Sequence, residues 1–143
     1  MSAAVPSTLD GPASDAGKLV LRLALGVLIL LHGIAKLGNG VGSIGGSLAR
    51  VGLPESLAYL VYVGEVLAPL LVIVGLWTRA AALVVVVNML VAVLLVHAGQ
   101  LLGLTKSGGY ALELQAMYLF GALALALLGA GRHSLGGAAG RWN

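Results

Sequence analysis

Residues 56–98 read SLAYLVYVGEVLAPLLVIVGLWTRAAALVVVVNMLVAVLLVHA, and this stretch decides the fold. It holds two apolar runs, residues 56–77 and 80–98, and its only charged residues are Glu65 and Arg79. A helix needs about 20 apolar residues to cross the hydrocarbon core of a bilayer. In lipid the backbone must satisfy its own hydrogen bonds, so these valine-rich runs favour helices over strands. The short polar step between them predicts a tight turn and an antiparallel pair.

Outward from this pair, two more apolar runs of similar length occupy residues 19–37 and 110–130. The sequence therefore predicts an all-α membrane protein, a four-transmembrane-helix bundle over residues 18–135. Residues 1–17 are small, polar and rich in Pro and Gly, which predicts a disordered tail. Residues 136–143 form a short C-terminal tail.

The composition supports a membrane protein and excludes several functions. Of the 143 residues 59% are hydrophobic and 9% are charged, whereas a soluble domain carries about 25% charged residues. The net charge is +3, but the eight Lys and Arg residues stand singly between apolar runs, so we expect no nucleic-acid binding. The absence of cysteine excludes disulfides and thiol chemistry. Any redox role must therefore use a bound cofactor or a partner.

The Gly-rich link between the first two helices contains one string that resembles a known motif. Gly40, Gly42 and Gly45 match the dinucleotide-binding pattern G-x-G-x-x-G. That pattern functions between a strand and a helix in a βαβ unit, and here it follows a membrane span. We therefore reject nucleotide binding.

The basic residues give a modest orientation signal. Basic flanks favour the cytoplasmic side of a membrane. With the N-terminus inside, five basic residues flank the inner side and three flank the outer side, which places both termini in the cytoplasm. The inner ones are Lys18, Arg22, Arg79, Arg132 and Arg141; the outer ones are Lys36, Arg50 and Lys106.

Ionisable residues within the spans are the best clue to function, because each is costly in hydrocarbon and needs a partner. At a rise of about 1.5 Å per residue, all four helices bring such a group to the outer half of the bundle. We predict a polar, ligand-binding pocket there. Its candidate residues are His32, Lys36, Glu65, His97 and Glu113.

Four other residues, Arg22, Arg79, Asn88 and Pro69, are assigned structural roles. Asn88 and His97 are nine residues apart, roughly 180° on a helix, so they cannot both point into one site. We expect His97 to point inward and Asn88 to make a helix contact.

Pro69 removes the hydrogen bond to the Glu65 carbonyl four residues earlier, which predicts a kink in the second helix. The freed carbonyl and the Glu65 carboxylate then both need donors, such as Lys36, His32 or water.

Simpler roles stay open for the same residues. Lys36 and Arg22 could snorkel to the headgroups, His97 and Glu113 could be interfacial, and Glu65 could form a structural ion pair. Aromatic residues near the span ends are expected to form an interfacial belt. They are Tyr59, Tyr62, Trp77, Tyr110 and Tyr118.

At this point the sequence resembles the DoxX family over about residues 18–135. No single piece is specific, but their order and spacing together are. The pieces are Leu21-Arg22-Leu23, His32-Gly33, Lys36-Leu37, Gly52-Leu53-Pro54, Glu65, Gly75-Leu76-Trp77-Thr78-Arg79, Asn88, His97, Glu113 and Gly131-Arg132-His133-Ser134-Leu135.

The resemblance implies a small four-helix protein of the bacterial inner membrane, similar to the membrane subunit of thiosulfate–quinone oxidoreductase. We therefore expect a redox-accessory protein that binds a quinone headgroup in its outer-half pocket. The chain has no evident cofactor of its own, so a protein partner would supply electrons. Family membership says more about fold than about chemistry.

Three alternatives remain open at this stage. The chain could be a non-catalytic assembly or scaffold subunit whose polar cluster locks the bundle, and it could form a homo-oligomer. It could be a small transporter, although basic residues in the first helix argue against cationic substrates. A metal or haem held by the histidines and glutamates is chemically conceivable, but the spacing is not specific.

Overall fold

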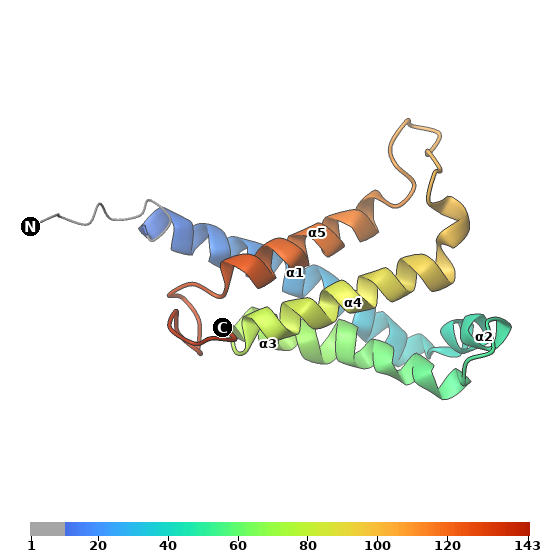
Figure 1. Cartoon of the computed structure of the whole chain (residues 1–143), viewed down its shortest axis with the longest axis horizontal. Helices are drawn as coiled ribbons and strands as arrows, with labels where there is room; N and C mark the ends of the chain where they lie inside the picture. The colour runs from blue at the N-terminus through green and yellow to red at the C-terminus, as the bar shows by residue number, and fades with distance from the viewer. Residues whose placement is uncertain (1–10) are drawn as a thin grey trace, which may run out of the picture.

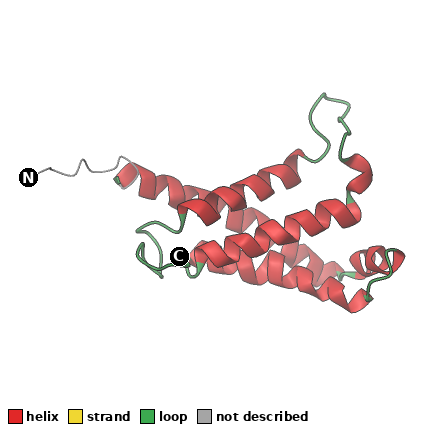
Figure 2. Ribbon diagram, in the orientation of Figure 1, coloured by secondary structure: helices red, strands yellow, loops and turns green. Residues whose placement is uncertain are grey.

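The computed structural model describes residues 11–143 and is helical throughout its ordered elements (Figure 2). Its long helices are α1 (Pro12–Asn39), α4 (Thr78–Val96) and α5 (Glu113–Leu128). Another span, Glu55–Val74, combines the 3-10 helix η2 (Glu55–Leu60), the π-helical turn η3 (Val63–Leu67) and α3 (Ala68–Val74). Within the described residues, strand pairing is limited to one isolated bridge between Leu104 and Tyr110.

The prediction of an all-α, four-helix membrane bundle is confirmed. Three helices, Pro12–Asn39, Glu55–Val74 and Thr78–Val96, are long and apolar enough to cross a membrane. The fourth, α5, is apolar and has 16 residues, which is about 24 Å at the usual rise. It is shorter than a typical span and packs along the full-length helices.

The helices form a ring of four antiparallel neighbours. α1 and α4 each contact both α3 and α5, so α1 and α4 occupy one diagonal of the bundle. The start of α1 and the C-terminal segment lie at one end, and α2 and the 97–112 loop lie at the other (Figure 1). We call these the terminal end and the loop end.

The core of the bundle uses small residues where helices approach closely. Ala68, Ala82 and Ala122 are almost fully buried, together with Ile29, Val85 and other apolar side chains. In a membrane, small residues let helix backbones come close enough for dispersion contacts to hold them. Large apolar side chains lie mostly on the outer surface, as expected of a protein that faces lipid.

The first helix begins earlier than the sequence predicts. Residues 12–17, assigned to a disordered tail, form the first turns of α1, with Pro at the start of the helix where its missing N–H costs nothing. Asp15 in this turn is buried: its carboxylate accepts the Arg132 backbone N–H at 3.1 Å and pairs with the Arg132 side chain at 3.4 Å. Residues 1–10 of the predicted tail lie outside the described residues.

The Gly-rich link also contains a helix that the sequence analysis missed, α2 (Gly42–Arg50). Its apolar residues Ile44 and Leu48 pack against Val41 and Ala58 in a small second core. The packing of this amphipathic face outweighs the low helix propensity of its glycines.

The turn between α3 and α4 lies at residues 75–77, slightly before the predicted position between residues 77 and 80. Gly75 adopts a left-handed conformation with φ 72°, and its α-carbon packs on Ser134 and the Arg22 guanidinium, leaving no room for a β-carbon. Trp77 is also left-handed, with φ 48°. Thr78 therefore begins α4, and Arg79 lies in its first turn.

The C-terminal segment folds back onto the terminal end of the bundle. The Asn143 side chain accepts hydrogen bonds from the Thr78 backbone N–H at 3.3 Å and the Thr78 hydroxyl at 3.1 Å. Arg79 donates to the Asn143 backbone oxygen at 3.1 Å and to the Ala126 carbonyl at 3.4 Å. The segment thereby satisfies free N–H groups at the start of α4.

Candidate functional site

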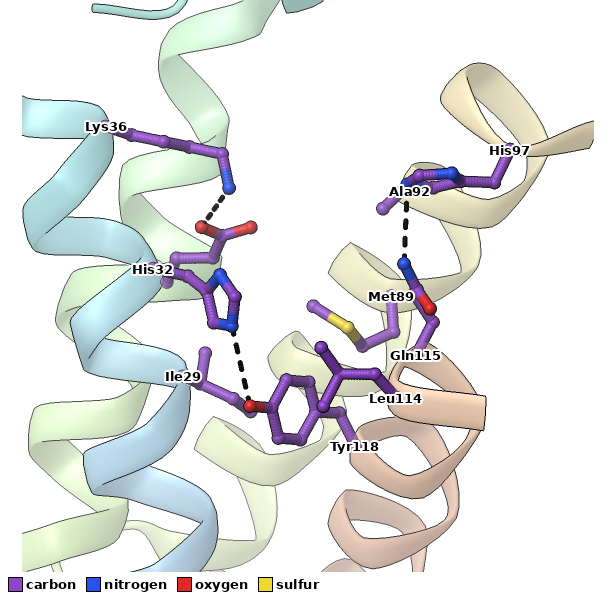
Figure 3. Close-up of a pocket in the computed structure, with 10 residues that line it drawn as sticks. Ile29, His32, Lys36, Met89, Ala92, His97, Leu114, Gln115 and Tyr118 are labelled. Carbon is purple, nitrogen blue, oxygen red and sulfur yellow. Dashed lines mark hydrogen bonds and ion pairs between the residues drawn. The ribbon is translucent and has the colours of Figure 1, made fainter. Parts of the chain in front are cut away.

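A cavity of about 140 Å³ lies between the helices towards the loop end. Side chains from α1, η3, α4, its C-terminal cap and α5 line it (Figure 3). The ten lining residues are Ile29, His32, Lys36, Glu65, Met89, Ala92, His97, Leu114, Gln115 and Tyr118.

One wall of the cavity carries an ion pair between Lys36 and Glu65. Glu65 is 4% exposed, and its other carboxylate oxygen accepts a hydrogen bond from the Asn88 amide at 3.3 Å. Asn88 also packs against Gly64, where a β-carbon would overlap it. The buried carboxylate is thus held from α1 and α4 at once, and both of its oxygens have a partner.

The backbone at Glu65 departs from a regular α-helix. Where Pro69 predicts a kink, the span contains the π-helical turn η3, in which the Ala68 N–H bonds to the Val63 carbonyl five residues earlier. The Glu65 carbonyl that Pro69 frees lies against Gly33 of α1, where a β-carbon would overlap it. Single π-helical turns inside α-helices often mark functional sites.

His32 stands on the same wall and faces Tyr118 of α5. The Tyr118 hydroxyl lies 3.5 Å from His32 Nε2, and the two rings meet edge to face with centroids 5.8 Å apart. This is a long contact, so both polar atoms keep capacity for another partner.

The opposite wall carries His97 and Gln115 (Figure 3). The Gln115 amide nitrogen lies 3.4 Å from His97 Nε2. His97 Nδ1 is buried and has no hydrogen-bond partner among the described residues. Buried polar atoms nearly always have a partner, so this one has capacity for a ligand or water.

The structure brings together four of the five predicted pocket residues: His32, Lys36, Glu65 and His97. Glu113 is the exception and a correction to the sequence prediction. It is exposed and is the first residue of α5. It lies five residues before Tyr118, about 140° away around a helix, so the two cannot share a face. At the N-terminus of α5 its negative charge interacts favourably with the positive end of the helix dipole.

His97 lines the cavity and Asn88 does not, as predicted, but the helical-wheel reason for this prediction needs correction. α4 ends at Val96, and His97 caps it with φ −116° and ψ 11°. The helical-wheel angle therefore does not apply to His97. Asn88 makes the expected helix contact and in addition bonds to Glu65, a pocket residue.

Sequence reasoning missed the contribution of α5. Tyr118 was assigned to an interfacial belt, but it is 9% exposed and lines the cavity. Gln115 lies one turn before Tyr118 on the same face of α5. The buried residues Ala122 and Leu125 extend this face toward the end of the helix. Tyr118 lies four residues before the small residue Ala122, and Gln115 lies three residues before Tyr118. This helical spacing places them on the packed face of α5 and could have identified them from the sequence.

Arg22 lies in the terminal half of the bundle, away from this cavity, and is 1% exposed. Its guanidinium donates to the Val72 and Ile73 carbonyls at the end of α3, at 2.9 and 2.8 Å. It also donates to the Ala130 and His133 carbonyls beyond the end of α5, at 2.9 and 2.8 Å. Its charge thus sits at the negative ends of two helix dipoles.

Chemically, the cavity offers hydrogen-bonding groups on two facing walls with apolar side chains between them. Lys36 and His32 supply donors on one side, and Gln115 and His97 supply them on the other. The Tyr118 hydroxyl reaches across from α5 to His32. No three His, Asp or Glu side chains within residues 11–143 converge as a metal site would require. The arrangement suits a small ligand with an apolar body and polar groups at both ends.

Comparison with known proteins identifies a family and a curated relative of the chain. The family model described as DoxX matches residues 17–98, more than half of the chain. A Bacillus subtilis (strain 168) protein named "Putative oxidoreductase CatD" is 29% identical over 82 residues, which cover 57% of this chain and 60% of that protein. The chain thus aligns with less than two thirds of its relative. No solved structure matches the chain significantly.

Proposed function

The chain belongs to the DoxX family of membrane proteins, and on this premise we propose that it is a redox-accessory protein whose cavity binds a quinone headgroup. A quinone headgroup is a flat apolar ring with two carbonyl oxygens on opposite sides. The observation that supports the proposal is the matching pattern of the cavity, with donors on facing walls and Ile29, Met89 and Leu114 between them.

The size of the cavity favours a single ring. Its 140 Å³ is close to the roughly 150 Å³ of an engineered cavity in another protein that binds benzene. A benzoquinone headgroup therefore fits better than a two-ring naphthoquinone. The isoprenoid tail would lie outside the cavity, among the apolar side chains that face the bilayer.

Two groups of side chains could hold and donate protons at the two carbonyl positions. Reduction of a quinone to a quinol consumes two electrons and two protons. The Lys36 ammonium carries a proton beside the Glu65 carboxylate, which could accept one in turn. The His32 and Tyr118 pair offers a second donor. Electrons would come from a partner protein that carries a redox cofactor.

Placement in the bacterial inner membrane with both termini in the cytoplasm is part of the same proposal. It rests on the five basic residues expected on the inner flanks against three on the outer. The cavity would then lie in the outer half of the membrane.

Binding of a soluble-tailed benzoquinone to the detergent-purified protein tests the proposal. We expect saturable binding that weakens about fivefold to tenfold in Gln115→Leu, because a site built to hydrogen-bond a carbonyl loses that contact. Glu113→Gln is the matched control, two residues away on the exposed face, and should bind like the wild type. Equal binding by both variants, or none by the wild type, would refute the proposal.

A second candidate, a non-catalytic scaffold subunit, is favoured by a different observation. Lys36, Glu65 and Asn88 satisfy one another within the bundle, as a structural lock requires. In that case Glu65→Gln lowers stability and Gln115→Leu changes nothing measurable.

A further inference from the structure

A second cavity, of about 380 Å³, lies at the terminal end of the bundle, far from the proposed quinone site. It is formed where the start of α1, the start of α4 and the segment after α5 meet. Its lining residues are Asp15, Lys18, Arg79, Leu128, Ala130, Gly131, Arg132, Ala138 and Asn143.

The side chains of this cavity carry an excess of positive charge. Three are basic, Lys18, Arg79 and Arg132, and one is acidic, Asp15, so their sum is +2. The Asp15 carboxylate is already bound by Arg132 through its backbone N–H and its side chain. Lys18 has no hydrogen bond or ion pair with any other described residue. A concave, cationic site of this kind attracts an anion.

The position of the cavity along the bundle indicates which anion. Trp77 at the start of α4 is 62% exposed, and Trp142 in the C-terminal segment is 53% exposed. Exposed tryptophan is typical of the membrane–water interface, at the depth of the lipid headgroups. Arg141 lies over the Trp142 ring at 5.8 Å, outside the cavity. The cavity is therefore at the depth where phospholipid phosphates are concentrated.

We propose that this cavity binds a phosphate-bearing anion and that an anionic phospholipid headgroup is its source. Arginine and lysine are the side chains that bind phosphate oxygens best. Basic pockets between membrane helices bind anionic lipid headgroups by the same chemistry. The volume leaves room for more than a bare phosphate group, which suits a headgroup with its glycerol unit. The bound lipid would join α1, α4 and the C-terminal segment.

The test uses the full-length protein in a neutral detergent and measures its melting temperature as phosphatidylglycerol, phosphatidylcholine or inorganic phosphate is titrated. We expect phosphatidylglycerol to raise the melting temperature and phosphatidylcholine to leave it unchanged. Lys18→Gln should weaken the apparent affinity for phosphatidylglycerol about fivefold, the usual effect of one basic residue at a membrane surface. The variant should fold normally, because Lys18 makes no hydrogen bond or ion pair with another residue in the described range 11–143.

Arg141→Gln is the matched control, since it removes one positive charge at the same end but outside the cavity. It should keep the wild-type response, and Lys18→Arg should restore it. Native mass spectrometry of co-purified phosphatidylglycerol gives a second readout that does not depend on melting. An equal response of Lys18→Gln and the wild type would overturn the site. An equal shift with millimolar inorganic phosphate would overturn the lipid as its source.

Discussion

The Glu65 carbonyl oxygen lies against Gly33 of the neighbouring helix, at a point where a β-carbon has no room. This carbonyl belongs to the π-helical turn η3, and Pro69 leaves it without its usual helical hydrogen bond because proline has no N–H. Glycine at position 33 allows α1 to approach it. The same turn of backbone aims the Glu65 carboxylate at Lys36. Gly33 thus allows the close approach of the two segments that carry the ion pair at the cavity.

Gly33→Ala should therefore destabilise the bundle. Overpacking a tight contact costs about 1–3 kcal/mol, and here the obstacle is backbone, which cannot move aside easily. Thermal unfolding in detergent measures the effect. Gly38→Ala on the same helix is the control, because no atom lies within 4 Å of its added β-carbon; it should be neutral or slightly stabilising. Equal melting temperatures for the two variants would contradict the close approach.

Removing one partner of the Lys36–Glu65 pair should cost more than removing both. Lys36→Met leaves the buried Glu65 charge with only Asn88 as partner, and breaking a buried pair costs about 3–5 kcal/mol. We expect the low end, because the Lys36 side chain is partly exposed. The double variant Lys36→Met with Glu65→Gln should recover part of the loss. Additive losses in the double-mutant cycle would show that the pair is not coupled.

Arg22→Lys should be destabilising although it keeps the charge. Arg22 donates four hydrogen bonds to carbonyls from α3 and from the segment after α5. A lysine ammonium is a single point and cannot span these positions. At about 1 kcal/mol for each lost hydrogen bond, we expect a loss of roughly 2–3 kcal/mol in unfolding free energy. Arg141→Lys, exposed at the same end, should leave the unfolding free energy unchanged. Equal unfolding free energies for the two variants would show that the four hydrogen bonds of Arg22 do not stabilise the fold.

Tyr118→Phe tests the His32 wall of the cavity. The substitution keeps the ring and its packing on His32 but removes the hydroxyl. Under the proposed function, benzoquinone binding should weaken about fivefold to tenfold, the equivalent of one hydrogen bond. The melting temperature should stay near the wild-type value. Tyr59→Phe, on an exposed tyrosine of η2, is the control. Unchanged binding in Tyr118→Phe would remove this wall from the site.

Much of the candidate site could be predicted from local sequence. Four of the five predicted pocket residues line the cavity, because the depth of a residue in a span follows from its distance along the chain. The sequence analysis placed Glu113 in the pocket wrongly and missed Tyr118 and Gln115. All three lie at the depth of the pocket, but depth along a helix does not tell which side of the helix a residue occupies. The facing depends on how each helix is rotated about its axis.

By itself, the sequence determined the membrane class, the all-α bundle of long apolar helices and their antiparallel order, since these depend on the length and apolarity of continuous segments. Only the tertiary structure decided which side chains meet: Tyr118 with His32, Asp15 with Arg132, Asn143 with Thr78. These pairs join positions far apart in the chain. They arise from helix rotation and from the folding back of the C-terminal segment, both of which are set by packing between helices rather than by any local pattern.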